Sequence, residues 1–287
     1  MTFVKSSILG FVVGDTLGVP FEGKRRGTYI VSGMSSFGTH FQPLGTWSDD
    51  TSMTLATMDS IIKNSGNIVP DDIMKRFVKW YDDAEYTATD EVFDVGNTTR
   101  DAIEHYMMSM EFCCSEKENG NGALMRMLPL ALCGASDKMV DSVSGLTHNH
   151  EISKICCKGY VHVVKHLLQS GILDFSVFDF GSISKNIQKI EILDVSDIRS
   201  SGYVVDTLDA AFWCVKTTNN YRDCVLKAVN LGGDTDTIAA IAGGISGIMY
   251  GIGGEYGIPE EWISCIMKRD WIEGLCDSFQ KFCFVGE

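Results

Sequence analysis

Two short acidic stretches, far apart in the chain, have residue types and spacing that suit metal chemistry. Residues 48–51 read Ser-Asp-Asp-Thr, and residues 232–237 read Gly-Gly-Asp-Thr-Asp-Thr. An apolar segment of helical periodicity follows each stretch, so each places its carboxylates at the start of a helix. A helix N-terminus favours a negative charge by roughly 0.3–1 kcal/mol. Helix capping therefore explains one carboxylate at each start more readily than two.

If the two helix starts lie together, their carboxylates and hydroxyls form a site for cations. Without cations such a cluster is unfavourable, because burying unpaired charges costs on the order of several kcal/mol per ion. Oxygen ligands with no cysteine nearby select magnesium or manganese rather than zinc. Two such ions, about 3.5–4 Å apart, can share a bridging carboxylate. Spacing alone leaves two interpretations open, a shared metal site or two independent helix caps.

The elements that must position these residues are helices. Strand patterns are poor, whereas 3.6-residue periodicity predicts helices in eight segments. These are residues 51–63, 71–80, 98–110, 122–133, 150–169, 202–217, 221–231 and 237–250. Residues 23–44 are predicted to form an ordered surface loop, and residues 171–201 are the least regular and a possible insertion. Since no linker divides the chain, we expect one all-α domain over residues 1–287.

Residues 237–254 carry no charge and are almost long enough to span a membrane. Gly243, Gly247 and Gly251 recur at four-residue spacing within this segment. Small residues at such spacing allow close helix packing in membranes and in protein cores alike. We favour a central helix of a soluble protein, because the segment is isolated, rich in glycine and directly preceded by two aspartates.

Composition and charge narrow the range of partners and compartments. The net charge of −14 argues against nucleic acid or an anionic membrane as the main partner. The basic run Lys24-Arg25-Arg26 is predicted to be a solvated loop. The ten cysteines contain no Cys-x-x-Cys pair, and the N-terminal residues lack the length and cleavage region of an export signal. An intracellular, cytoplasmic protein with reduced thiols is therefore expected.

Six blocks, taken in order along the chain, resemble the ADP-ribosylglycohydrolase family, which includes dinitrogenase reductase-activating glycohydrolase and the ADP-ribosylarginine hydrolases. The blocks are GDTLGVPFE (14–22), GTWSDDT (45–51), FDVGNTT (93–99), GNGALMR (120–126), THNH (147–150) and GGDTDT (232–237). Any one block is weak, but the ordered set covers most of the chain. The resemblance implies a compact all-α fold, an orthogonal helical bundle holding two Mg²⁺ or Mn²⁺ ions.

The resemblance also implies which residues bind the metal pair. Both acidic stretches supply ligands, and this chain has a serine where many relatives have threonine, which keeps a hydroxyl oxygen available. The implied ligands are Ser48, Asp49, Asp50, Asp234, Asp236 and Thr237.

A glycine-rich turn and a histidine block are implied to contact ADP-ribose. Backbone N–H groups of a glycine-rich turn at a helix start can hold a pyrophosphate. The implied contacts are Gly120, Asn121, Gly122, Ala123, Leu124, Met125, Arg126, His148 and Asn149. Two alternatives stay open: Arg126 as a buried structural ion pair, and His148 as a core or capping histidine.

Three carboxylates are implied to take part in catalysis: Asp94, Glu22 and the metal ligand Asp49. Asp94 would face the scissile bond and protonate the leaving group. Its alternative role is a helix N-cap. Glu22, on a mobile loop in relatives, would be a general base or an extra ligand, and its alternative is an exposed loop carboxylate.

The resemblance predicts a metal-dependent hydrolase that removes ADP-ribose from modified protein side chains, with arginine as the leading linkage. The partners would be an ADP-ribosylated protein and ADP-ribose itself, and the protein is expected to be a monomer. Two alternatives remain: hydrolysis of serine-linked or small ADP-ribose conjugates, and a non-catalytic ADP-ribose-binding relative.

Overall fold

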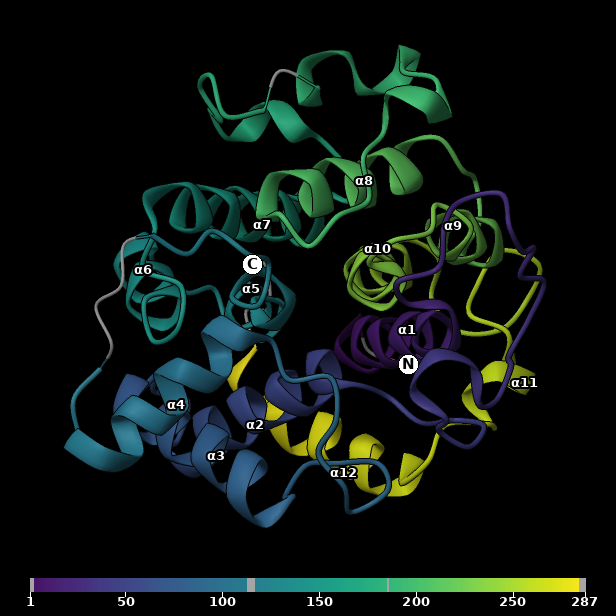
Figure 1. Ribbon diagram of the computed structural model, residues 1–287. Helices are drawn as coiled ribbons and strands as arrows, with labels where there is room; N and C mark the ends of the chain where they lie inside the picture. Colours follow the sequence, from purple (N-terminus) through teal and green to yellow (C-terminus); the bar gives the residue numbers. More distant parts are fainter. Residues whose placement is uncertain (1–2, 113–116, 185, 284–287) are drawn as a thin grey trace.

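The core of the protein is a pair of apolar helices that lie side by side at the centre of the molecule, α1 (Phe3–Gly18) and α10 (Thr235–Tyr250) (Figure 1). The computed structural model describes residues 3–112, 117–184 and 186–283. Nearly every residue of α1 is buried, as are residues 235–247 of α10. A helix that is apolar all round belongs in the interior of a protein. The prediction that residues 237–254 contain a central helix is confirmed.

Glycines allow these two helices to approach more closely than side chains would permit. A Cβ atom on Gly14 would lie 2.1 Å from the carbonyl oxygen of Ala239, and one on Gly243 would lie 2.3 Å from the carbonyl oxygen of Gly10. A helical run at residues Phe3–Phe21 is long and apolar enough to cross a membrane, but 89% of its most apolar window is buried in the structure. The close contact fixes α1 against the start of α10, where one acidic stretch lies.

The remaining helices surround this pair (Figure 1). They are α2 (Asp49–Lys63), α3 (Pro70–Asp83), α4 (Asn97–Ser109), α5 (Leu128–Leu132), α6 (Asp137–Ser144), α7 (Glu151–Ser170), α8 (Val204–Lys216), α9 (Tyr221–Val229), α11 (Glu260–Ile263) and α12 (Arg269–Phe279). Apart from isolated bridges, no strand occurs in the described part of the chain. The predicted all-α class is therefore confirmed.

Some helix predictions were wrong. Residues 122–133 do not form one helix: a 3₁₀ turn, η3 (Leu124–Arg126), precedes the short helix α5, because Pro129 lacks the N–H needed to continue a helix through it. Helices α1, α6, α11 and α12 were not predicted. Burial of α1 on all sides removes the polar face that gives a helix its periodicity. In α12 the signal was present, since Ile272, Cys276 and Phe279 form one buried face.

Among the described residues of the irregular segment 171–201, three 3₁₀ turns lie beside α8, at the top of Figure 1: η4 (Phe175–Val177), η5 (Ile187–Ile192) and η6 (Val195–Asp197). Arg26 ties this segment to the rest of the fold by donating hydrogen bonds to the carbonyl oxygens of Val195, Ile198 and Leu231 at 2.5–2.7 Å. Arg26 is therefore a half-buried clamp, and the prediction of a solvated basic loop was wrong for this residue.

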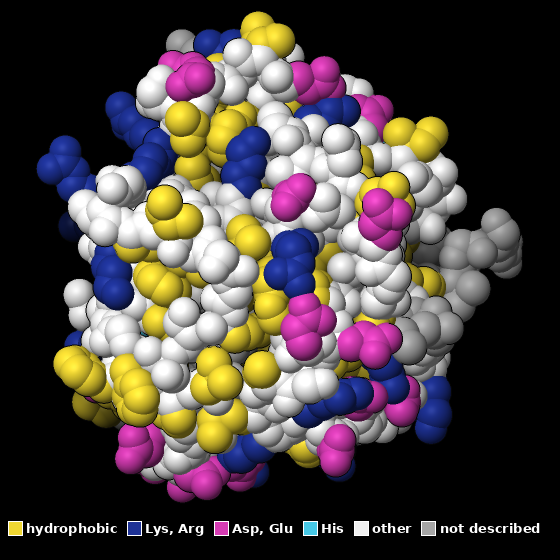
Figure 2. Space-filling model, turned by 90° about the vertical axis from the view of Figure 1, so that its right-hand side faces the viewer, with side chains coloured by type: hydrophobic (Ala, Val, Ile, Leu, Met, Phe, Trp, Pro, Cys, Tyr) yellow, Lys and Arg dark blue, Asp and Glu magenta, His cyan; other side chains and the backbone are white. Residues whose placement is uncertain are grey.

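Charged side chains on the visible surface are mixed in sign. On the face in Figure 2, Lys and Arg side chains are interspersed with Asp, Glu and hydrophobic side chains. Among the described side chains, this face shows no continuous basic surface of the kind that a nucleic-acid backbone would need.

Candidate active site

The two acidic stretches meet where α2 and α10 begin. Thr237 Oγ1 donates a hydrogen bond of 3.1 Å to Asp50 Oδ2, although the two residues are 187 positions apart in the chain. Ser48 Oγ donates to the same oxygen at 3.1 Å. Ser48 is also the N-cap of α2, as expected, and accepts from the Asp50 N–H at 3.3 Å. The helix starts thus form one site rather than two separate caps.

Asp15 of α1 completes this site, and sequence reasoning gave it no role. Its carboxylate accepts hydrogen bonds from the backbone N–H groups of Ser48 and Thr51 at 3.0–3.1 Å and from the Thr51 hydroxyl at 2.6 Å. Burial raises the pKa of Asp15 to about 6. Asp15 therefore caps α2 from a neighbouring helix. A signal was available, because Asp15 is the only charged residue among the mainly apolar residues 6–21.

The floor of the site is crowded with buried carboxylates. Asp15, Asp50 and Asp236 each offer an oxygen within 4.8 Å of the others. Burial, followed by repulsion from neighbouring carboxylates, raises the pKa values of Asp50, Asp236 and Asp49 well above their usual range. Asp50 Oδ1 and Asp236 Oδ2 are buried without a hydrogen-bond partner in the described residues. Buried polar atoms are rarely left unpaired, so these oxygens fit ligands of a hard cation.

A second group of oxygens extends the floor toward solvent. Glu22, Asp234 and Asp236 each offer an oxygen within 4.8 Å of the others. Asn121 Nδ2 donates to Asp234 Oδ2 at 2.6 Å and to Thr207 Oγ1 at 2.9 Å, which orients the Asp234 carboxylate. The three possible ligand atoms in this group are carboxylate oxygens, the ligand type of hard cations.

A cleft of about 280 Å³ opens above this floor. It brings together most of the residues predicted from sequence and adds Gly202 and residues 95–99, which had been given no role. Its lining consists of Glu22, Asp49, Asp94, Val95, Gly96, Asn97, Thr98, Thr99, Gly120, Asn121, Gly122, Met125, His148, Gly202, Asp234 and Thr237. The added residues 95–99 belong to one of the six sequence blocks, which was the signal available for them.

Four predicted substrate contacts do not line the cleft: Ala123, Leu124, Arg126 and Asn149. The first three are fully buried. Arg126 donates to the carbonyl oxygens of Gly122 and Val143 and to the Thr147 hydroxyl, and burial lowers its pKa to about 10. Arg126 is therefore structural, but it binds carbonyl and hydroxyl oxygens rather than a carboxylate.

The glycine-rich turn does not start an α-helix. The 3₁₀ turn η3 follows it, and the Asn121 N–H already donates to the Gly202 carbonyl oxygen at 3.0 Å. The structure therefore does not contain the predicted helix N-terminus for a pyrophosphate. Gly122 is needed for another reason, since a Cβ there would lie 2.7 Å from Cε1 of His148.

His148 lies in the cleft wall and is almost fully buried. Its Nδ1 is 2.8 Å from Thr147 Oγ1. Burial and the nearby Arg126 lower its pKa to about 3, so the imidazole is neutral at physiological pH. His150, the next histidine, caps α7 by accepting from the Ile152 N–H at 3.1 Å.

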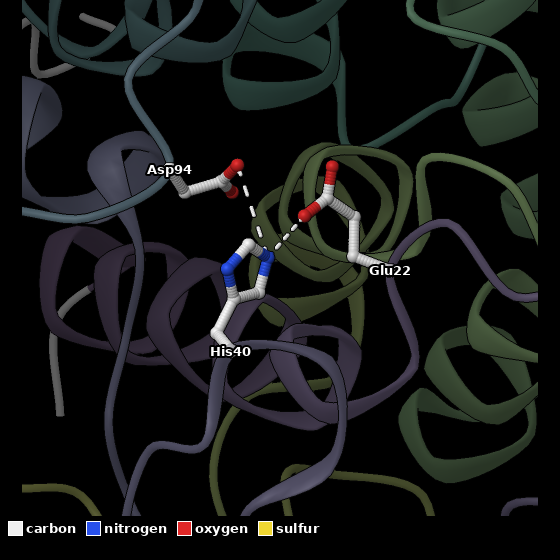
Figure 3. A group of neighbouring side chains, drawn as sticks. All are labelled: Glu22, His40 and Asp94. Atoms are coloured by element: carbon white, nitrogen blue, oxygen red, sulfur yellow. Dashed lines mark hydrogen bonds and ion pairs between the residues drawn. The ribbon is translucent and has the colours of Figure 1, made fainter.

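At the mouth of the cleft the structure adds His40, which sequence reasoning missed, to the predicted residues Glu22 and Asp94 (Figure 3). His40 Nε2 is hydrogen-bonded to Glu22 Oε2 and lies 3.8 Å from Asp94 Oδ1. The bond to Glu22 raises the pKa of His40. Burial, followed by the charge of Glu22, raises the pKa of Asp94 to about 7. No sequence motif marked His40.

The alternatives for the two mouth carboxylates do not hold. The N-cap of α4 is Gly96, so Asp94 does not cap this helix. Asp94 has a left-handed backbone, with φ of 58°, and its side chain is only 22% exposed. The Glu22 side chain is 26% exposed and bonded to His40, so it is not a free loop carboxylate.

The protein is thus an all-α protein with an acidic cleft whose carboxylate oxygens could hold a metal ion. The family model for ADP-ribosylglycohydrolase matches residues 3–285. The chain belongs to this family. It is 31% identical to an ADP-ribosylarginine hydrolase, Tri1, of Serratia proteamaculans, over 95% of this chain and 77% of that protein.

Two further relatives agree with this assignment. The glycohydrolase of ADP-ribosyl-dinitrogen reductase from Rhodospirillum rubrum is 30% identical, over 90% of this chain and 88% of that protein. A solved structure described as an ADP-ribosylglycohydrolase-related protein complex superposes with a TM-score of 0.80, at 27% identity and 98% coverage of both chains.

Proposed function

We propose that this protein is an ADP-ribosylarginine hydrolase, which releases ADP-ribose from modified arginine side chains of a protein substrate. Family membership and the arginine hydrolases among its relatives support this proposal. The observation that carries it is the cleft floor, where Asp50 and Asp236 each keep one buried carboxylate oxygen without a hydrogen-bond partner among the described residues. Such oxygens suit hard cations, which assist hydrolysis.

Two divalent cations, Mg²⁺ or Mn²⁺, are the proposed cofactors. The residues that would hold them are Ser48, Asp49, Asp50, Asp234, Asp236 and Thr237. When bound, such ions polarise substrate oxygens and lower the pKa of a coordinated water. The crowding of carboxylates supports this assignment, because cations would offset the burial and the repulsion that raise the pKa values of Asp50 and Asp236.

Asp94 is the proposed proton donor. With a pKa of about 7, a substantial share of this carboxyl is protonated near neutral pH. In the proposed reaction a water oxygen bonds to the anomeric carbon of the ribose, and the bond from that carbon to the guanidine nitrogen breaks. The Asp94 proton moves to the leaving nitrogen, and Glu22 accepts the proton that the water releases.

The walls of the cleft would bind and orient the ADP-ribose. Asn121 and the neutral His148 offer polar atoms there, and Gly120, Gly122 and Gly202 leave room for close approach. An acidic protein repels a pyrophosphate at long range, so the proposed cations would also contribute to binding.

Release of free ADP-ribose tests the proposal. An arginine-modified protein, a serine-modified protein and a small ADP-ribose conjugate are each incubated with Mg²⁺, with Mn²⁺ and with EDTA. Metal-dependent release from the arginine substrate alone is expected. Release from the serine substrate alone would keep the metal site and discard the arginine assignment. ADP-ribose binding without turnover of any substrate would indicate a non-catalytic relative.

We also propose that the protein is a cytoplasmic monomer. The eight cysteines among the described residues are all free thiols, which supports a reducing compartment. Light scattering after size-exclusion chromatography tests the monomer, and a mass near that of two chains would contradict it.

A further inference from the structure

His40 lies on a turn whose backbone is strained. The 3₁₀ turn η2 (Gly38–His40) is flanked by Phe37 and Phe41, whose φ angles of 66° and 54° fall in the left-handed region. Such conformations persist only where the surroundings impose them, and they occur often at functional sites. Phe37 and Phe41 are 60% and 80% exposed, so burial of these residues does not explain the strain.

The turn is held against Glu22 by two hydrogen bonds. Thr39 Oγ1 donates to the Glu22 carbonyl oxygen at 2.7 Å, and His40 Nε2 bonds to the Glu22 carboxylate. Gly38 packs so closely that a Cβ there would lie 2.1 Å from the carbonyl oxygen of Pro20. The strained turn therefore fixes the position of His40 relative to Glu22.

His40 also faces the opposite side of the cleft mouth. Its Nε2 lies 3.8 Å from Asp94 Oδ1 (Figure 3). Its ring centroid lies 5.2 Å from that of Phe93. One imidazole thus lies between carboxylates that come from two separate loops, at residues 22 and 94.

His40 pairs with the Glu22 carboxylate, which otherwise lies among other carboxylates. The Glu22 carboxylate lies between His40 and the acidic floor. One of its oxygens is within 4.8 Å of carboxylate oxygens of Asp234 and Asp236. Asp94 adds a further carboxylate on the other side. Like charges this close repel, and a ring N–H that donates to Glu22 stabilises its placement.

We propose that His40 is a positioning residue that holds the Glu22 carboxylate over the acidic floor, so that Glu22 is in place to accept a proton during hydrolysis. The proposal rests on the function proposed above. His40 itself does not touch the reacting atoms. It acts through Glu22, so its loss should matter only while Glu22 is present.

A double-mutant cycle tests this role. The proteins are the wild type, His40→Ala, Glu22→Gln and the double variant, assayed for kcat and KM on an arginine-modified protein. Removing a hydrogen-bond partner that orients a side chain at a metal site typically lowers activity by about 10- to 100-fold. We expect kcat of His40→Ala to fall by that factor with little change in KM. The kcat of the double variant should be no lower than that of Glu22→Gln.

Two further variants separate positioning from general damage. His40→Gln keeps an N–H donor for Glu22 and should recover part of the lost kcat. His162→Ala removes another partly buried histidine with a carboxylate partner, Asp137 Oδ1 at 2.8 Å. Unlike Glu22 and Asp94, Asp137 does not line the cleft, so this variant should leave kcat unchanged.

Affinity for Mn²⁺ alone, measured by isothermal titration on the same proteins, gives a readout that does not depend on turnover. Since Glu22 offers an oxygen within 4.8 Å of oxygens of the proposed ligands Asp234 and Asp236, both single variants should bind Mn²⁺ about tenfold more weakly. The double variant should bind it no more weakly than Glu22→Gln. Independent effects of the two substitutions on kcat and on Mn²⁺ affinity would overturn the role of His40. If the wild type releases no ADP-ribose, the proposed function fails, and the Mn²⁺ cycle alone decides whether His40 positions Glu22.

Discussion

The floor and the mouth of the cleft are built in opposite ways. On the floor, Asp50 and Asp236 begin rigid helices and are each 1% exposed. In the mouth, Glu22 and Asp94 come from loops, their side chains are 26% and 22% exposed, and Asp94 has a strained backbone. Ligands for cations need fixed geometry, whereas groups that meet a substrate must remain accessible. The difference shows how one acidic cluster can serve both needs.

Removing a floor carboxylate should have the largest effect. Asp50→Ala is expected to abolish ADP-ribose release at any Mg²⁺ or Mn²⁺ concentration, because it deletes an implied ligand of the metal pair. The helical circular dichroism spectrum should stay unchanged. Asp137→Ala, at the exposed start of α6, is the matched control and should keep full activity. If Asp50→Ala retained activity, the floor carboxylates would not be needed as metal ligands, and the proposed difference in role between floor and mouth would fail.

Removing the carboxyl group of Asp94, in the mouth, should lower activity by a smaller but still large factor. Asp94→Asn is expected to lower kcat by about 10²–10⁴-fold, the usual contribution of a general acid. Because the pKa of Asp94 is about 7, the wild-type rate should fall as pH rises through that value and the carboxyl loses its proton. The pH–rate profile of the variant should lack this fall. An unchanged profile would assign the proton donor elsewhere.

The helix pair beneath the floor should tolerate little change. Gly14→Ala places a methyl group 2.1 Å from the Ala239 carbonyl oxygen, which should lower the free energy of unfolding by about 1–3 kcal/mol. Gly274→Ala in α12 is the control, since nothing lies within 4 Å of its Cβ position. There alanine should stabilise by up to about 1 kcal/mol. Denaturant melts of both variants check this, and equal losses would contradict the close packing of α1 and α10.

Asp15 should contribute mainly to the stability of the floor. Asp15→Ala leaves the N–H groups of Ser48 and Thr51 without their acceptor, which should cost about 1–2 kcal/mol after relief of carboxylate repulsion. Asp15→Asn keeps one acceptor oxygen and should lose less. A denaturant melt in EDTA measures the difference. An Asp15→Ala protein as stable as the wild type would show that α2 does not need this cap.

Much of the floor could be predicted from sequence, and less of the mouth. Adjacent aspartates after Ser48, and the pair at residues 234 and 236, carry their own signal because they stand at helix starts. The structural role of Arg126 was harder to predict, since a sequence motif does not show that a guanidinium group points into the core. His40 had no local signal at all, because its partners lie 18 residues away at Glu22 and on another loop at Asp94.

The sequence by itself determined the helical class, the acidic helix starts and the family resemblance, because periodicity, capping and motif order are local properties. Only the tertiary structure decided that the Thr237 hydroxyl meets Asp50, that Asp15 caps α2, and that His40 lies between Glu22 and Asp94. These contacts depend on how α1, α2, α10 and two loops pack together. Packing brings together residues that are distant in the chain, and their spacing in the sequence does not predict such contacts.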